Sequence, residues 1–138
     1  MKRPEHIILH HSLTKDGKTV SWSAIRRYHV HKLNWSTIGY HFGIELVGER
    51  YEILMGRMET RTGAHCLGHN NNSIGICFVG NFDIDVPEHS QLIVGMNLIR
   101  SILERYGLDL DAVKGHCDFS GKTCPGKLFP LDEFRRKL

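Results

Sequence analysis

Apolar and polar positions alternate with two different periods along this chain. Some runs are short and are either continuously apolar or apolar at every second position, which predicts β-strands. The predicted strands cover residues 7–9, 39–47, 50–54, 73–80 and 112–114. The run at 73–80 is apolar throughout and is bounded by turn formers, which indicates a central strand buried on both faces.

The predicted strand at 39–47 carries a regular alternation. Its period of two places one set of side chains on each face of the sheet. The two sets are Tyr40, Phe42, Ile44 and Leu46 on one face and His41, Gly43 and Glu45 on the other. Gly48-Glu49 then predicts a turn, so residues 50–54 form the second strand of a hairpin.

Three further segments have the helical period. The residues that fall near one helical face are Trp22, Ile25, His29 and Leu33 in the first segment and Leu92, Met96, Ile99, Leu103 and Tyr106 in the longest. Ser21 is the predicted N-cap of the first helix. Asp85 and Glu88 resemble a capping box before the longest helix, which ends near Gly107. Residues 131–138 form a short closing helix.

Because strands and helices interleave, the sequence predicts an α/β fold with a central mixed β-sheet and helices on both faces. A length of 138 residues suits one compact domain, 1–138. Residues 15–18 predict a turn. Residues 56–72 are polar and irregular, and a loop of that length inside a small domain is often functional.

Composition excludes several classes of partner. The formal net charge is only +3, which is too small to predict nucleic-acid binding but is compatible with an anionic cell-wall polymer. No apolar stretch approaches the ~20 residues of a membrane span. Residues 1–6 lack the features of a signal peptide, so we expect the protein to be cytoplasmic as synthesised, with no membrane partner.

The strongest candidate for chemistry is a glycine-rich loop at 115–126. It contains His116 and Cys124, and imidazole and thiolate are the ligands that zinc prefers. His10 follows the apolar run at 7–9, and a side chain at the end of a central strand can face such a loop. The pattern predicts one zinc held by these three residues, with water in the fourth position as in catalytic sites. The alternative is that they are ordinary loop and core residues of a chain with ten His.

The chain has four cysteines, which are Cys66, Cys77, Cys117 and Cys124. Without a secretory signal, free thiols or metal ligands are favoured over disulfides. Cys77 lies in an apolar run and is a predicted core residue. Cys66 and Cys117 each follow a His directly, and we expect either to be a solvent-exposed thiol near the site.

Four motifs in a fixed order carry a family resemblance. They are Ile-Ile-Leu-His-His-Ser, Gly-Tyr-His-Phe, Gly-Ala-His-Cys-Leu-Gly-His-Asn-Asn-Asn-Ser-Ile-Gly-Ile-Cys-Phe-Val-Gly-Asn-Phe and Gly-His-(seven residues)-Cys-Pro-Gly. Nearly the whole chain resembles the zinc-dependent N-acetylmuramoyl-L-alanine amidases of the type 2 group, which includes the amidase-type lysozymes of bacteriophages and the animal peptidoglycan recognition proteins. The resemblance implies hydrolysis of the amide between N-acetylmuramic acid and L-alanine of the stem peptide.

The resemblance also implies roles for single residues. Tyr40 and Lys122 match positions that assist catalysis, and either can donate a hydrogen bond to the oxyanion of the tetrahedral intermediate. The division of work between them stays open. His65 matches a residue that lines the substrate groove. Thr37 departs from the Asp of many relatives, whereas Cys124, which non-catalytic animal members lack, is present and favours an enzyme.

The implied partner is peptidoglycan or a soluble muropeptide, with one zinc per chain and a monomeric protein. The alternative function is a non-catalytic peptidoglycan-binding or sensing module of the same fold. A third is binding of a regulatory protein partner, which no sequence feature supports. The expected setting is either a phage or prophage lysin released onto the cell wall or a recycling enzyme acting on imported muropeptides.

Overall fold

The computed structural model describes residues 3–13 and 21–138, so the predicted turn at 15–18 lies outside the described residues. The helices and strands in chain order are β1 (His6–His11), α1 (Trp22–Arg27), the π-helical η1 (Tyr28–Lys32), β2 (Phe42–Val47), β3 (Arg50–Met55), β4 (Ser73–Phe78), α2 (His89–Tyr106), β5 (Val113–Gly115) and α3 (Leu131–Arg136). Short 3-10 turns precede β4 and flank β5. Every predicted strand is present within a few residues of its expected bounds.

The five strands form one mixed sheet in the order β3-β2-β4-β1-β5. β1 pairs in parallel with β4 and β5, β2 pairs in parallel with β4, and β2 pairs antiparallel with β3 as the predicted hairpin. The run expected to be central is therefore the middle strand, and all six of its residues are buried. The register sets His10 opposite Cys77 on β4, and Leu9 opposite Gly115 on β5.

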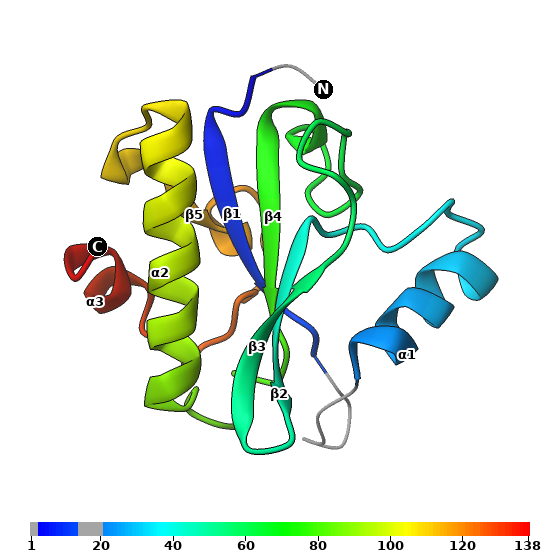
Figure 1. The fold of residues 1–138 in the computed structure, drawn as a ribbon, viewed down its shortest axis with the longest axis horizontal. Helices are drawn as coiled ribbons and strands as arrows, with labels where there is room; N and C mark the ends of the chain where they lie inside the picture. Colours follow the sequence, from blue (N-terminus) through cyan, green and yellow to red (C-terminus); the bar gives the residue numbers. More distant parts are fainter. Residues whose placement is uncertain (1–2, 14–20) are drawn as a thin grey trace.

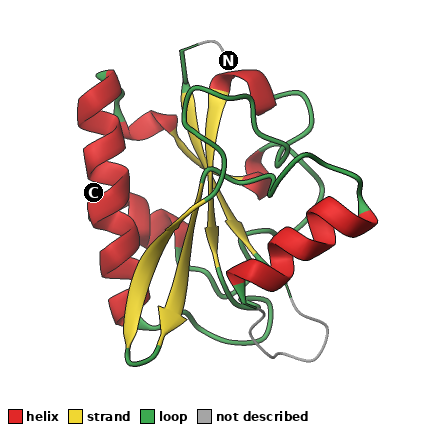
Figure 2. Ribbon diagram, turned by 45° about the vertical axis from the view of Figure 1, so that its right-hand side comes forward, coloured by secondary structure: helices red, strands yellow, loops and turns green. Residues whose placement is uncertain are grey.

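Helices cover both faces of this sheet, which confirms the predicted fold class. α2 and α3 lie on one side, and α1 with η1 lies on the other (Figure 1). The view turned by 45° shows the same layers, with the sheet between the long helix and the shorter helical segment (Figure 2). Within the described ranges, none of the helices has the length and apolar character needed to cross a bilayer.

The main hydrophobic core lies between the sheet and α2. Alternate residues of β1 and β4 point into it, together with the apolar stripe of the long helix. α2 approaches the sheet closely at Gly95, where an added Cβ would lie 2.5 Å from the ring of Phe78. A second, smaller cluster lies between the sheet and α1, and its buried members are Trp22, Ile25, Ile38, Cys77 and Val79.

The first helix is found where predicted, but its second half has a different geometry. Ser21 is the N-cap, and its side chain accepts a hydrogen bond from the Ala24 N–H. The helix then widens into a π-helical turn in which the Leu33 N–H donates to the Tyr28 carbonyl. Asn34 follows with φ of 57°, a left-handed conformation that Asn tolerates. Leu33 therefore lies at the helix end with 39% of its surface exposed, and its predicted place on the buried face is wrong.

Two other local predictions are wrong. β2 begins only at Phe42, because the backbone of residues 39–41 forms hydrogen bonds to residues 56, 57, 64 and 75 instead of a regular ladder. Tyr40 and Phe42 were predicted on one face, but Tyr40 packs on the α1 side and Phe42 packs toward α2. The Asp85 cap is also absent, since α2 begins after Glu88 without a side-chain cap. The residue before Pro87 is biased away from helical backbone, which delays the helix.

Candidate metal centre

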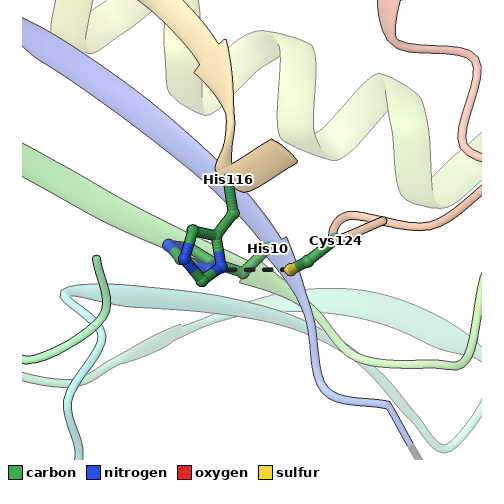
Figure 3. Close-up of side chains that lie close together, drawn as sticks. All are labelled: His10, His116 and Cys124. Carbon is green, nitrogen blue, oxygen red and sulfur yellow. Dashed lines mark hydrogen bonds between the residues drawn. The ribbon is translucent and has the colours of Figure 1, made fainter. Parts of the chain in front are cut away.

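Three side chains that are far apart in the sequence meet at one edge of the sheet. His10 lies near the end of β1, His116 directly follows β5, and Cys124 comes from the loop beyond. Because β1 and β5 are parallel neighbours, their carboxyl ends lie side by side. One ligand atom from each of the three residues lies within 4.8 Å of the others. Figure 3 shows the three side chains converging, with Cys124 Sγ 3.7 Å from His10 Nδ1.

The loop from 116 to 124 folds back through its own hydrogen bonds. The Cys117 N–H donates to the Cys124 carbonyl at 2.7 Å, which closes the loop at its base. The Asp118 carboxylate accepts from the Gly115 N–H at 2.9 Å, and the Ser120 hydroxyl donates to the His116 carbonyl at 3.2 Å. These bonds hold the backbone of His116 and Cys124 together.

The protonation state of the two imidazoles suits a divalent cation. Burial holds the pKa of His10 well below its usual value, and the neighbouring His65 and His116 lower it further. Burial, followed by the Lys122 charge, also lowers the pKa of His116. Both imidazoles are therefore neutral at pH 7 and keep a lone pair for a metal.

Cys124 is the third donor. Burial raises the pKa of its thiol to about 12, opposed by the His11 N–H, which donates to Sγ at 3.4 Å, and by the Lys122 charge. A zinc ion replaces a thiol proton when it binds, because the thiolate is the ligand. Two neutral imidazoles and one such sulfur fit zinc, and the three residues are a possible metal site.

Tyr40 lies beside this cluster, with its ring centroid 5.2 Å from that of His10. Burial raises the pKa of its phenol well above 10, and the neighbouring Cys77 and Cys124 side chains act in the same direction. The hydroxyl therefore keeps its proton at neutral pH and is available as a hydrogen-bond donor. The sequence did not predict that Cys77 would lie near this phenol.

Lys122 is exposed on the loop two positions before Cys124. Its positive charge lowers the pKa of both His116 and Cys124, so the ammonium lies close enough to act on them electrostatically. Lys122 thus adds a positive charge near the His116 and Cys124 side chains.

His65 directly contacts one of the three predicted ligands. Its Nδ1 lies 2.9 Å from His10 Nε2, and its Nε2 lies 3.3 Å from the Ser73 hydroxyl oxygen. The same residue, with Tyr40 and Leu67, also borders a pocket of about 320 Å³. Ser73 was not predicted as a site residue, although the every-second-residue pattern of small side chains on β4 was a signal for it.

A larger hollow opens on the α1 side of the site. It has a volume of about 590 Å³. Its lining residues are Ser12, Leu13, Ala24, Ile25, Tyr28, His29 and Tyr40. Tyr40 and His29 border both hollows, so the two pockets adjoin beside the converging side chains.

The cysteines are free thiols, as expected. Cys77 is fully buried, which confirms it as a core residue. The expectation of an exposed thiol is wrong for Cys66, which is only 3% exposed. Its loop folds onto the Asn70 side chain, whose carbonyl oxygen accepts a hydrogen bond from the Cys66 N–H at 2.8 Å. Cys117 is half-buried.

The chain is similar to known proteins over most of its length. Residues 1–127 match the family described as N-acetylmuramoyl-L-alanine amidase. The chain is 33% identical to the endolysin of Enterobacteria phage T3 over 128 residues, which cover 88% of this chain and 80% of that protein. Among solved structures, it is similar to the N-acetylmuramoyl-L-alanine amidase LysC from Clostridium intestinale, with a TM-score of 0.86, 31% identity, and coverage of 98% of this chain and 85% of that one.

A third similarity concerns a recognition protein with a bound ligand. The Drosophila protein PGRP-LB, solved as a Y78F mutant in complex with tracheal cytotoxin, superposes with a TM-score of 0.79 and 26% identity. The match covers 95% of this chain and 79% of that chain. The fold is thus shared by amidases and by peptidoglycan recognition proteins.

Proposed function

The chain belongs to the N-acetylmuramoyl-L-alanine amidase family, and from this premise we propose that it is a zinc-dependent hydrolase of the amide between N-acetylmuramic acid and L-alanine of the stem peptide. One observation carries the proposal. His10, His116 and Cys124 offer three ligand atoms within 4.8 Å of one another, and three protein ligands with one open position are typical of catalytic zinc.

The three residues would hold the ion at the carboxyl edge of the sheet. Bound there, zinc would supply Lewis-acid chemistry for activation of water and polarisation of an amide carbonyl. The backbone hydrogen bond from Cys117 to Cys124 closes the loop, so the ligand atoms need little rearrangement to close around a cation.

Lys122 and Tyr40 would stabilise the reacting amide. The Lys122 charge acts on His116 and Cys124, so its ammonium would cancel part of the negative charge that develops on the carbonyl oxygen. The Tyr40 hydroxyl is protonated at neutral pH and can donate a hydrogen bond to the same oxygen or pass a proton toward the leaving amine.

The substrate would lie in the two hollows that adjoin beside Tyr40. Tracheal cytotoxin, with which PGRP-LB was solved in complex, supports a muropeptide as the class of ligand. His65 borders the smaller hollow, and this position supports the proposal that His65 lines the substrate groove. The similarity to the phage T3 endolysin supports action on the cell wall.

The second candidate is a peptidoglycan-binding or sensing module that does not cleave. The observation behind it is the similarity to PGRP-LB, whose name describes recognition and says nothing of cleavage. The presence of Cys124 favours the enzyme, because binding a muropeptide in the hollows needs no thiolate at the sheet edge.

Purified sacculi separate the two candidates. We expect the zinc-loaded protein to release new amino-terminal L-alanine and to clear turbid sacculi, chelation to stop both, and added zinc to restore both. His116→Ala should be inactive, whereas His31→Ala, which removes an exposed histidine elsewhere, should cleave normally. Binding to sacculi without new amino termini would support the sensing module, and full cleavage by metal-free protein would overturn the proposal. Soluble muropeptides tested in parallel with sacculi would separate a lysin from a recycling enzyme.

A further inference from the structure

A chain of hydrogen bonds runs from His10 into the interior of the sheet. The His10 Nε2 atom lies 2.9 Å from Nδ1 of His65, and Nε2 of His65 lies 3.3 Å from the Ser73 hydroxyl oxygen. The Ser73 hydroxyl in turn donates to the His69 carbonyl at 2.6 Å. The chain thus starts at a proposed ligand and ends at a backbone acceptor.

The donor and the acceptor in each of these hydrogen bonds follow from the last one, which ends at the His69 carbonyl. A hydroxyl has one proton, and Ser73 gives it to the His69 carbonyl, so its oxygen must accept from His65 Nε2–H. A neutral His65 then has a bare Nδ1, which must accept from His10 Nε2–H. A neutral His10 protonated at Nε2 has its lone pair on Nδ1. That is the atom 3.7 Å from Cys124 Sγ, facing the other two proposed ligands.

The His65 ring is held in this position from two directions. Its backbone N–H, like that of Cys66, donates to the Asn70 side-chain oxygen at 2.8 Å. On β4, the absence of a side chain at Gly75 leaves the space that the ring occupies, since an added Cβ there would lie 2.6 Å from the His65 Cγ atom. The ring therefore packs against the strand with little freedom to turn.

We propose that His65 and Ser73 are positioning residues, which fix the His10 tautomer so that its Nδ1 lone pair points at the metal. The proposal rests on the proposed metal site and extends it inward by two residues. Free imidazole exchanges between two tautomers, and one of them would place an N–H where the ion must bind. An acceptor opposite Nε2 removes that tautomer and makes the ligand a better base.

A matched pair of substitutions tests the acceptor alone. His65→Asn keeps an oxygen near the position of Nδ1, whereas His65→Leu has nearly the same size and branching and no acceptor. Zinc affinity of the metal-free proteins is measured by competition with a chromophoric chelator. The His10 tautomer is read from long-range proton–nitrogen NMR correlations of nitrogen-15-labelled protein.

We expect His65→Leu to bind zinc about 10–100-fold more weakly than wild type, the range found for partners of ligand histidines. His65→Asn should stay within a few-fold of wild type. In the metal-free state, His10 should be the Nε2–H tautomer in wild type and in His65→Asn, and a mixture in His65→Leu. Ser73→Ala should give an intermediate loss, because it removes only the acceptor for His65 Nε2–H.

Equal zinc affinity in the Leu and Asn variants would overturn the proposal, and so would a wild-type His10 protonated at Nδ1. If the Leu variant does not fold, the wild-type NMR pattern and the Ser73→Ala titration still decide it. A wild-type protein that binds no zinc would instead refute the metal site and with it the proposed function, so the two failures are distinguishable.

Discussion

The two faces of the sheet are made from the same strands but differ in chemistry, and β4 shows the contrast within six residues. On the α2 side it presents Ile74, Ile76 and Phe78 to the main core. On the α1 side it presents Ser73, Gly75 and Cys77. Each of the latter lies beside a candidate site residue: the Ser73 hydroxyl is bonded to His65, Gly75 leaves space for the His65 ring, and the Cys77 thiol is near Tyr40.

The difference teaches how one small domain separates stability from chemistry. Continuous apolar packing on the α2 side supplies the burial that stabilises the fold. That allows the other face to bury polar side chains, provided each finds a hydrogen-bond partner. A substitution should therefore affect stability or zinc chemistry according to the face that it changes.

The largest expected effect is on the α1 side. Cys124→Ser removes the only sulfur among the three proposed ligands. We expect zinc to be lost and amide cleavage to fall to background, while the free energy of unfolding of the metal-free protein changes by about 1 kcal/mol or less. Metal analysis, sacculus cleavage and denaturant unfolding measure the three quantities. A variant that keeps zinc and turnover would break the comparison on this face.

The matching change on the α2 side is Phe78→Ala. The Phe78 ring is fully buried and packs edge-on against Phe129, with centroids 5.0 Å apart. Its loss should lower the free energy of unfolding by about 3–5 kcal/mol, whereas zinc bound per folded chain should not change. Denaturant unfolding monitored by fluorescence, with metal analysis of the folded fraction, tests both. A cost near zero would mean that this face is not the main core.

Lys122→Ala should act on rate alone. The ammonium stabilises charge that appears only in the transition state, so turnover should fall about 10²–10³-fold. Zinc content and muropeptide affinity should stay at the wild-type level. Tyr40→Phe should behave in the same way but more mildly, since only a hydroxyl is lost.

Lys127→Ala is the control for Lys122, because Lys127 is another exposed lysine of the same loop region. It should cleave sacculi at the wild-type rate. If Lys122→Ala instead loses zinc, Lys122 maintains the conformation of the loop and does not act by stabilising the transition state. Unchanged turnover in Lys122→Ala would remove it from catalysis.

The smallest effect is expected at the ion pair between Glu59 and α2. Glu59, on the loop after β3, pairs with Arg105 of α2 at 2.8 Å and accepts from the Tyr106 hydroxyl at 2.7 Å. Burial raises the pKa of the Glu59 carboxyl, but the bonds from Arg105 and Tyr106 outweigh it, and the pKa is lowered overall.

A carboxyl whose pKa is lowered by folding stabilises the protein at any pH above the pKa that it has in the unfolded chain. That contribution is lost as the pH falls through the pKa of the folded state. The gap in unfolding free energy between wild type and Glu59→Gln should therefore be at most about 1 kcal/mol at pH 7 and shrink below about pH 4. Zinc affinity at pH 7 should not change. Thermal unfolding across pH checks the trend, and a gap that grows on acidification would contradict it.

The sequence predicted those parts of the fold that one-sided burial controls. The stripe of α2, the alternation of β2 from Phe42 and the apolar run of β4 each have the period of their element. Two features were not predictable, which are the π-helical turn at 28–32 and the placement of Tyr40 and Phe42 on opposite faces. Both depend on backbone hydrogen bonds to distant segments. The Asp85 cap failed where Pro87 overrode a local signal.

The candidate site followed the same division. His10, His116 and Cys124 were paired from strand ends and ligand type, and the structure brings their atoms together. The contact between His10 and His65 was not predictable, because it joins residues 55 positions apart and depends on the empty space at Gly75. Ser73 was also missed, because the run at 73–80 was interpreted as uniformly apolar and the role of Ser73 depends on the face that it occupies.

The central claim is that the α1 side of the sheet binds zinc through two imidazoles and one thiolate, and X-ray absorption at the zinc edge tests it most directly. We predict one zinc per chain, with one sulfur at about 2.3 Å and imidazole nitrogens at about 2.0–2.1 Å. The sulfur should disappear from any zinc spectrum of Cys124→Ser. A first shell of oxygen and nitrogen alone in the wild-type protein would contradict this claim.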